Sequence, residues 1–434
     1  MEFVSLRFVL TMADKIISGI DIGSSKVATV AAVRDPESGQ TRIIGFHSTP
    51  SRGVKKGLVV DIDQVASSVE ESVEKTERMA GHKITSAFVS VGGPHISSLN
   101  SHGVVAVSNQ HGEISEEDVE RVVDSARAIS LSTTRQIIEV SPREYIVDGQ
   151  SGIKNPVGMS GVRLEVDTHI ITASHTNLKN IDRCLEHLGI ENDGFIFSGL
   201  ASAETVLTDT EKELGVVLAD IGGGKIDICL YTEGSLSYSS SIAVGARHVT
   251  NDIAVGLRVS LESAEKIKLH LSKEFSGKKE ASAKRGEQID LTSLNLPEHI
   301  KEVPMKTLLD GIIQPRIEEI YKLIAQEIEK SEFSQEVPSG IVITGGGALT
   351  CGIVETGRRV VGLPIRIGLP EGVSGLLDEV LTPAYATTVG LILYGRKNIM
   401  EQEIGFKRFN KVLKDFSMSG TIGKVKSLVK QFIP

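Results

Sequence analysis

Two short stretches of the sequence combine an aspartate with small residues, as a phosphate-binding loop does. The first is Gly19-Ile20-Asp21-Ile22-Gly23-Ser24-Ser25-Lys26 and the second is Asp220-Ile221-Gly222-Gly223-Gly224-Lys225-Ile226-Asp227. Glycines permit a positive φ and let backbone N–H groups approach an anion closely, and serine hydroxyls add hydrogen bonds. The aspartates would hold a hydrated Mg²⁺ that bridges to the phosphate, because a carboxylate repels the phosphate itself.

A third glycine cluster would complete a nucleotide site. Thr344-Gly345-Gly346-Gly347-Ala348 follows the apolar stretch GIVIT, and the missing side chains would let a purine and its ribose lie against the backbone. One such cluster alone is as often a hairpin turn. Three clusters, each after an apolar stretch, favour phosphate binding. The sequence has no GxxxxGK(S/T) and no GxGxxG at a strand–helix junction, which argues against the P-loop and dinucleotide folds.

The clusters need strands to hold them, and the neighbouring residues have that pattern. β-Branched residues and alternation over 15–33 and 214–231 predict two strand–turn–strand units, which indicate an internal duplication. Ser115 and Asp118 are spaced as a helix capping box. Other helices are expected from about Asp63 and over residues 195–207, 315–331 and 381–395. Strands and helices alternate, so the predicted class is α/β.

The composition limits the class of partner. With 434 residues the chain exceeds what one hydrophobic core organises, so we expect at least two domains. The net charge is −9, Trp is absent and aromatics make up 4%, which argues against a nucleic-acid partner. Cys184, Cys229 and Cys351 are far apart and outside any CxxC motif, as expected for buried thiols in a reducing cytoplasm.

The end of the chain differs from the body. Residues 407–434 carry seven Lys or Arg against a single acid, Asp415. Apolar residues recur there at three- and four-residue spacing, with lysines at their edges: Ile422, Val425, Leu428, Val429, Phe432 and Ile433, flanked by Lys424, Lys426 and Lys430. Such a stripe suits an anionic membrane surface, and the alternatives are packing against the body or in a partner's groove. So short a helix would fold only on binding.

The order of these motifs resembles the superfamily of actin, sugar kinases and heat-shock chaperone ATPases. Two acid–glycine hairpins are followed by a glycine-rich adenosine loop and by the small-residue helix PAYATTVG. Within the superfamily, the stretches SLNSHGVVAV, GMSGVRLEVDTHI and GLASAETVLTDTEKELGVVLADIGGG resemble the FtsA family of bacterial cell-division actin homologues. The likeness covers roughly residues 15–395 and the tail.

The resemblance implies an actin-like ATPase fold, with two domains flanking a nucleotide cleft and an FtsA-type inserted subdomain in the first. The first core subdomain would comprise residues 14–83, 168–212 and 381–398, and the inserted subdomain residues 84–167. The second core subdomain would comprise 213–235 and 313–380, and its small subdomain, a candidate FtsZ-binding region, 236–312. A linker (399–420) and the C-terminal amphipathic membrane-targeting helix (421–434) would follow.

The resemblance also assigns the ligands ATP and Mg²⁺ to particular residues. Asp21, Gly23, Ser24, Ser25 and Lys26 would form the first phosphate loop, and Gly222, Gly223 and Gly224 the second, with Lys225 and Asp227 beside it. Asp21 and Asp220, with Asp227 as a third candidate, would hold Mg²⁺ through water. Gly345, Gly346, Gly347 and Ala348 would lie at the adenosine. Glu265 and Lys268 would lie near the ribose and base, or else form a solvated helix face.

Two positions depart from the relatives' pattern. Filament-forming cell-shape actins carry an acid 22 residues before the aspartate of the second loop, where this chain has Ser198. No carboxylate is available there to orient an attacking water, so we expect slow or negligible ATP hydrolysis, with ATP mainly a structural ligand. Lys225 stands where relatives usually have threonine. Its charge would add to phosphate binding or point outward without effect.

The function that the resemblance implies is structural. The protein would polymerise with itself, tether FtsZ filaments to the inner face of the cytoplasmic membrane at the division septum, and recruit later cell-division proteins. It would be a peripheral membrane protein on anionic lipid and at most a slow ATPase. The alternatives are an actin-like assembly platform for pili or secretion, and a small-molecule kinase of the same superfamily.

Overall fold

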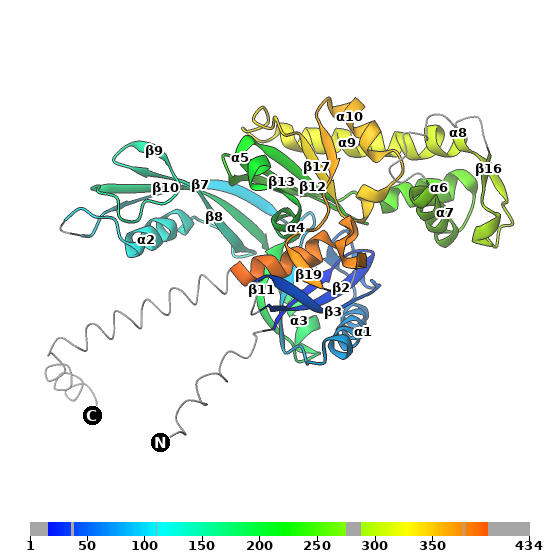
Figure 1. Cartoon of the computed structure of the whole chain (residues 1–434), viewed down its shortest axis with the longest axis horizontal. Coiled ribbons are helices and arrows are strands. Elements are labelled where there is room, and N and C mark those ends of the chain that lie inside the picture. The colour runs from blue at the N-terminus through cyan, green and yellow to red at the C-terminus, as the bar shows by residue number, and fades with distance from the viewer. Residues whose placement is uncertain (1–15, 36–38, 110, 275–287, 376–377, 398–434) are drawn as a thin grey trace, which may run out of the picture.

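The computed structural model of the protein describes residues 16–35, 39–109, 111–274, 288–375 and 378–397. The expected linker and the expected C-terminal amphipathic helix therefore lie outside the described residues. Figure 1 shows a sheet-containing module at one end of the long axis, a mainly helical part at the other, and two sheet-based domains between them. No helix in the described ranges is long and apolar enough to cross a membrane.

The first domain is built on a six-stranded sheet. Its order is β11 (Glu191–Phe197), β6 (Ser86–Val91), β1 (Ile17–Ile22), β2 (Lys26–Arg34), β3 (Thr41–Pro50) and β19 (Val373–Gly375). Helices α1 (Ile62–Ala80) and α3 (His175–Glu186) pack together on one face. The Asp61 side chain accepts a hydrogen bond from Gln64 N and caps α1, and Gly81 ends it at φ 70°. A two-stranded ribbon, β4 (Val54–Lys55) and β5 (Leu58–Val59), precedes α1.

The second domain repeats the strand order of the first. Its five-stranded sheet runs β14 (Ser235–Ile242), β13 (Ile226–Thr232), β12 (Val216–Ile221), β17 (Ile341–Thr344) and β18 (Ile365–Ile367). In the first sheet, β3, β2, β1, β6 and β11 occupy the same places, with two antiparallel pairs followed by parallel ones. The predicted internal duplication is thus confirmed, and it covers more than the two hairpins.

Helices complete the second domain and its small subdomain. The helices beside the sheet are α4 (Ser198–Val206), α5 (Asp209–Leu214), α9 (Gln314–Glu329) and α10 (Ile353–Val361). The small subdomain contains α6 (Arg247–Leu257), α7 (Leu261–Glu274), α8 (Met305–Leu308) and the ribbon β15 (Gln288–Asp290) and β16 (Glu302–Pro304). Short turns lie at η2 (Thr292–Leu294), η3 (Leu309–Ile313), η4 (Gly346–Leu349), η5 (Asp378–Leu381) and η6 (Pro383–Tyr385). A last helix covers residues 386–397.

The inserted module has its own sheet and core. The sheet order is β7 (Ser97–Ala106), β10 (Arg163–Ser174), β8 (Arg135–Val147) and β9 (Gln150–Ile153), and α2 (Glu116–Arg127) packs on it. The expected capping box is present, because Ser115 and Asp118 bond each other's backbone N–H. The separate core consists of Ile114, Val122, Ala126, Tyr145, Val147, Leu164 and Val166. All three cysteines are buried and unpaired.

Several expected boundaries differ in the structure. β6 lies within the expected inserted range 84–167 but pairs with β1 and β11, and β10 runs on to Ser174, so the module's sheet spans β7 to β10. β14 lies in the second sheet, although its residues from 236 on were assigned to the small subdomain. β19 pairs with β3 of the first sheet although residues 313–380 were assigned to the second domain. Strand pairing sets these boundaries, and for β6 and β19 the pairing partners lie far away in the chain.

Two expected helices begin later than predicted. Residues 195–197 belong to β11, and α4 starts at Ser198, because the apolar FIF run is a buried parallel strand end, which periodicity cannot separate from a helix. In 381–395 the helix starts at residue 386. Pro383 lies in the short turn η6 just before it, where its fixed φ is tolerated at a helix start.

Candidate functional site

Two hairpin turns of the same geometry lie at the centre of the molecule. Gly23 N donates a hydrogen bond to Lys26 O at 3.0 Å, and Gly222 N donates one to Lys225 O at 2.9 Å. In each hairpin an aspartate directly precedes the isoleucine that ends the first strand. Asp21 is paired with Ala28 on the second strand, and Asp220 is paired with Asp227. The turns are therefore equivalent by the duplication, and Lys26 is the counterpart of Lys225.

The two turns face each other across a narrow cavity. A β-carbon on Gly223 would lie 2.9 Å from Ser25 Oγ, and one on Gly224 would lie 2.8 Å from Ser24 Oγ, so only glycine permits this approach. The cavity between the turns measures about 70 Å³. It is lined by Asp21, Gly23, Ser24, Ser25, Lys26, Ser198, Asp220, Gly222, Gly223, Gly224, Lys225, Asp227, Gly345, Gly346, Ala384 and Thr387. The structure thus brings both predicted phosphate loops together.

Hydroxyl groups orient two of the carboxylates. Ser90 Oγ donates to Asp21 Oδ1 at 2.6 Å. Ser202 Oγ, at 2.5 Å, and Thr387 Oγ1, at 2.8 Å, both donate to Asp220 Oδ2. Burial raises the pKa of Asp21, and the Ser90 hydrogen bond and nearby lysines oppose that rise. Ser90, Ser202 and Thr387 were not predicted.

The third carboxylate, Asp227, is held by a lysine. Lys225 Nζ forms an ion pair with Asp227 and donates to Ser198 Oγ at 2.9 Å. Ser198 Oγ in turn donates to Val91 O at 3.1 Å, and Ser241 Oγ donates to Asp227 Oδ1 at 2.6 Å. Burial raises the pKa of Asp227, while Lys225 works against that rise. Lys225 therefore points into the cleft.

Lys26 points to a different part of the same cavity. Its Nζ hydrogen-bonds Ala384 O and lies 3.9 Å from the centroid of the Tyr385 ring. Burial lowers the pKa of Lys26, and Asp21 and Asp220 oppose the shift. The lysines of the two turns thus have unlike partners.

The residues expected at the nucleoside divide into two groups. Gly345 and Gly346 line the cavity, and Gly345, at φ 81°, lies against Asp220 Oδ1 and Ile221 O. Gly347 and Ala348 are buried beside Ile221 in the core instead. Glu265 and Lys268 form an ion pair at 2.7 Å, and both bond Thr250 Oγ1, which ties α7 to α6. These two do not line this cavity, and their contact with a ribose stays a prediction.

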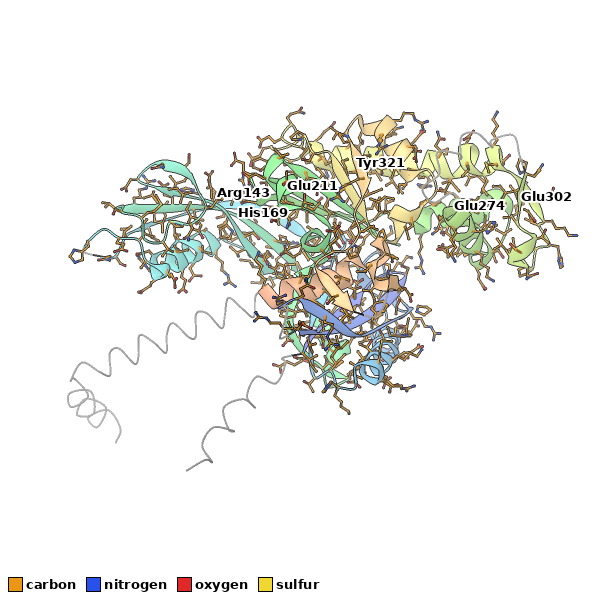
Figure 2. The ribbon with its side chains drawn as sticks, viewed as in Figure 1. Arg143, His169, Glu211, Glu274, Glu302 and Tyr321 are labelled. Carbon is orange, nitrogen blue, oxygen red and sulfur yellow. The ribbon has the colours of Figure 1, made fainter. Side chains whose placement is uncertain are left out.

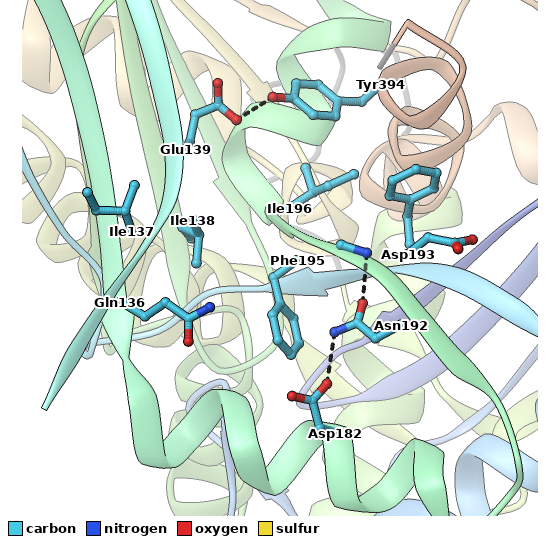
Figure 3. Close-up of a pocket in the computed structure, with 12 residues that line it drawn as sticks. Gln136, Ile137, Ile138, Glu139, Asp182, Asn192, Asp193, Phe195, Ile196 and Tyr394 are labelled. Carbon is cyan, nitrogen blue, oxygen red and sulfur yellow. Dashed lines mark hydrogen bonds between the residues drawn. The ribbon is translucent and has the colours of Figure 1, made fainter. Parts of the chain in front are cut away.

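A larger groove lies where the inserted module meets the first domain. It measures about 520 Å³ and lies between β8 and the edge strand β11, with Tyr394 of the last helix at one end (Figure 3). Tyr394 Oη donates a hydrogen bond to Glu139, and Asn192 Nδ2 donates to Asp182 Oδ1 at 2.8 Å. Its lining is both apolar and acidic: Phe88, Ile137, Ile138, Phe195 and Ile196 with Glu139, Asp182 and Asp193. No motif in the sequence marked it.

Two domains of equal strand order, with facing acid–glycine turns between them, define an actin-like ATPase fold. Solved structures share it at 14% identity. One is a PilM-PilN type IV pilus biogenesis complex (TM-score 0.61, covering 87% of this chain and 98% of that chain). Another is MreB 5 of Spiroplasma citri bound to AMPPNP (TM-score 0.50, covering 91% and 98%).

Within that fold, this chain belongs to the FtsA family of cell division proteins. The family described as "SHS2 domain inserted in FTSA" matches residues 93–172, and "Cell division protein FtsA" matches residues 217–390. The cell division protein FtsA of Pseudomonas aeruginosa is 40% identical, covering 88% of this chain and 89% of that protein. The protein of Borreliella burgdorferi is 36% identical, covering 96% and 98%, and that of Escherichia coli 36% identical, covering 90% and 92%.

Proposed function

We propose that this protein is an ATP-binding cell division protein that polymerises and tethers FtsZ filaments to the inner face of the cytoplasmic membrane, where it recruits later division proteins. The observation that carries the proposal is the pair of equivalent glycine turns facing each other across one cavity. Family membership supports the role in cell division.

The cleft residues fit a phosphate chain with Mg²⁺. Ser24, Ser25, Gly223 and Gly224 line the cavity without bulky side chains, and their backbone amides and hydroxyls would donate to phosphate oxygens. Asp21 and Asp220 would hold a hydrated Mg²⁺, which when bound would neutralise phosphate charge. Ligand pockets for small molecules usually have about 300–1,000 Å³, and the cavity has about 70 Å³. We therefore infer that the two turns separate when ATP binds.

We also propose that ATP hydrolysis in this cleft is slow. Ser198 occupies the place where a carboxylate would orient water, and its hydroxyl is engaged by Lys225 and Val91 O. We expect turnover well below about 1 s⁻¹, the low end for ordinary enzymes. Phosphate release at saturating ATP measures it, and a rate above that value contradicts the proposal.

Apolar side chains exposed toward the two ends of the molecule are the contact points that we propose for self-assembly. Val162, on the inserted module, is 74% exposed, and Val255, on α6, is 79% exposed. Figure 1 places these elements at opposite ends of the long axis. A head-to-tail contact between unlike ends produces an open filament.

Two further surfaces suit the remaining partners. The acidic and apolar groove between the module and the first domain offers later division proteins a site for an extended segment with basic and apolar residues. The membrane anchor is proposed from sequence alone, from the lysine-edged apolar stripe over 421–434. One copy should bind weakly, and a polymer should bind far more tightly through effective concentration.

Co-sedimentation with FtsZ and anionic liposomes tests the proposal. The full chain with ATP should carry FtsZ into the liposome pellet, and a chain without the last twelve residues should not. Phe432→Glu should behave like the truncation, because a charge on the apolar stripe prevents its insertion. Equal pelleting of FtsZ by all three proteins would exclude the tail as the anchor, and no pelleting by the full chain would exclude the tether.

A further inference from the structure

Lys225 is a buried cation among the acids of the cleft. Its side chain is only 12% exposed, and that of its ion-pair partner Asp227 is 2% exposed. Its charge also lowers the pKa of Asp21 against the effect of burial. The ammonium therefore lies where it can act on groups of both turns.

The strand order fixes where Lys225 lies relative to the third glycine cluster. Asp220 on the middle strand β12 is paired with Asp227 on β13 and with Thr344 on β17. Gly345 directly follows Thr344, and Lys225 lies just before β13, so the two are on opposite sides of Asp220. A nucleotide with its base end at Gly345 and Gly346 would extend its phosphates past Asp220 toward Lys225.

Comparison with the first hairpin turn shows that the position of the Lys225 side chain is particular to the second turn. Lys26, the counterpart of Lys225, is bonded to Ala384 O and stacked on Tyr385, on the side of the last helix. Lys225 instead contacts Ser198 and Asp227, and it lies beyond Asp220 from Gly345 by the strand order. Only one of the two lysines therefore lies where the end of a phosphate chain would arrive.

We propose that Lys225 binds the terminal phosphate of a nucleoside triphosphate, so that the cleft selects triphosphate over diphosphate and signals its presence to the inserted module. The inference rests on the proposed ATP-binding function. Lysine is a flexible point-charge donor to phosphate oxygens. The phosphate replaces Asp227 as partner of the ammonium, while Asp227 keeps its hydrogen bond from Ser241.

The link to the module runs through Gly92 and Gly93, which join β6 to β7. A β-carbon on Gly92 would collide with Lys225 Nζ and would lie 2.9 Å from both Asp227 oxygens. Gly93 N donates to Ser241 Oγ at 3.0 Å, and the same hydroxyl donates to Asp227. Movement of Lys225 to a phosphate thus changes the packing at the root of the module.

Calorimetric binding of AMPPNP and ADP, each with Mg²⁺, to the full chain tests the inference. The unchanged protein should bind AMPPNP more tightly than ADP. Lys225→Met should weaken AMPPNP binding about 10- to 100-fold, the usual effect of one charge-assisted hydrogen bond, and leave ADP binding within about threefold. Lys225→Arg should retain most of the selectivity. Lys212→Met is the matched control, because Lys212 is a similarly buried lysine paired with Glu204 outside the cleft.

Lys225→Met leaves Asp227 buried without its cation, so Lys225→Met with Asp227→Asn provides a second, neutral variant that should show the same loss of selectivity. Equal losses for both nucleotides, or none, would overturn the inference and leave the proposed ATP binding intact. If the unchanged protein bound neither nucleotide, the proposed function would fail first.

Amide hydrogen exchange over residues 92–99 should differ between the AMPPNP and ADP states and lose that difference in Lys225→Met. Identical exchange in the unchanged protein would contradict the link to the module.

Discussion

At the scale of single residues, the carboxylates that the motifs predicted are oriented by hydroxyl groups that no motif marks. Asp21 and Asp220 were predicted because they end apolar strands before small residues. The hydroxyls that orient Asp220 come from Ser202, 18 residues back, and Thr387, 167 residues on. Such distant partners cannot be read from local patterns, because serine and threonine are frequent and only the fold selects which of them meet a carboxylate.

Removing the two hydroxyls that donate hydrogen bonds to Asp220 should weaken Mg²⁺-dependent ATP binding. Supporting hydrogen bonds to a metal-holding group are typically worth 10- to 100-fold in affinity, so we expect about that loss for Ser202→Ala with Thr387→Val. Nucleotide binding with and without a chelator measures it. Thr205→Val is the matched control, because Thr205 lies on the same helix but bonds the backbone of Glu371 outside the cleft. An unchanged affinity in the double variant would show that Asp220 needs no such support.

At the scale of elements, the inserted module is fastened to the second domain as well as to the first. His169 of β10 shares hydrogen bonds with Ser239 on β14, at 2.8 Å, and with Asn100 on β7, at 2.7 Å. Arg143 of β8 lies over the ring of Phe333 at 4.3 Å. Figure 2 labels Arg143 and His169 close together where the module meets the green strands of the second domain. The family resemblance implied an inserted module, but no motif marked His169 as part of this junction.

The His169 junction should give the protein a defined acid sensitivity. Burial lowers the pKa of His169 to about 3, whereas an unfolded histidine has a pKa of about 6.5. The unfolded chain therefore binds the proton first, so the stability that neutral His169 contributes is complete above about pH 6.5 and is lost as the pH falls toward 3. Urea unfolding across that range should show a steeper loss of stability in the unchanged protein than in His169→Gln.

At neutral pH, His169→Ala should destabilise the protein by about 1–3 kcal/mol, because it leaves buried hydrogen-bond partners unmatched. His187→Ala, at an exposed position just after α3, should leave the unfolding midpoint unchanged. If both alanine variants unfold alike, His169 does not fasten the module.

At the scale of the whole molecule, the sequence predicted the fold class and the internal duplication better than it predicted the subdomain boundaries. The α/β alternation and the two hairpins indicated two equivalent domains, and the sheets confirm this in their order. The sheet that receives β6 or β19 could not be predicted, because their pairing partners lie far away in the chain. The pairing of β14 was missed although it follows β13 after two residues, as in a local hairpin. The groove beside β11 was missed because its lining comes from segments far apart in the chain.

Self-assembly should depend on the exposed apolar residues at the two ends. Val255→Glu should abolish or strongly reduce ATP-dependent pelleting of polymers, because a charge buried without a partner at a contact costs several kcal/mol. Leu214→Glu is the control, since Leu214 is 60% exposed on α5, away from both ends. Unchanged pelleting of the Val255 variant would place the contact elsewhere.

Binding of ATP to the full chain, measured by calorimetry with Mg²⁺ and again with the cation chelated, tests the central claim most directly. The paired turns and their carboxylates predict one site per chain, with clearly tighter binding in the presence of Mg²⁺ than without it. Absence of binding at millimolar ATP with Mg²⁺ would contradict the assignment of the cleft and, with it, the proposed ATP-binding function.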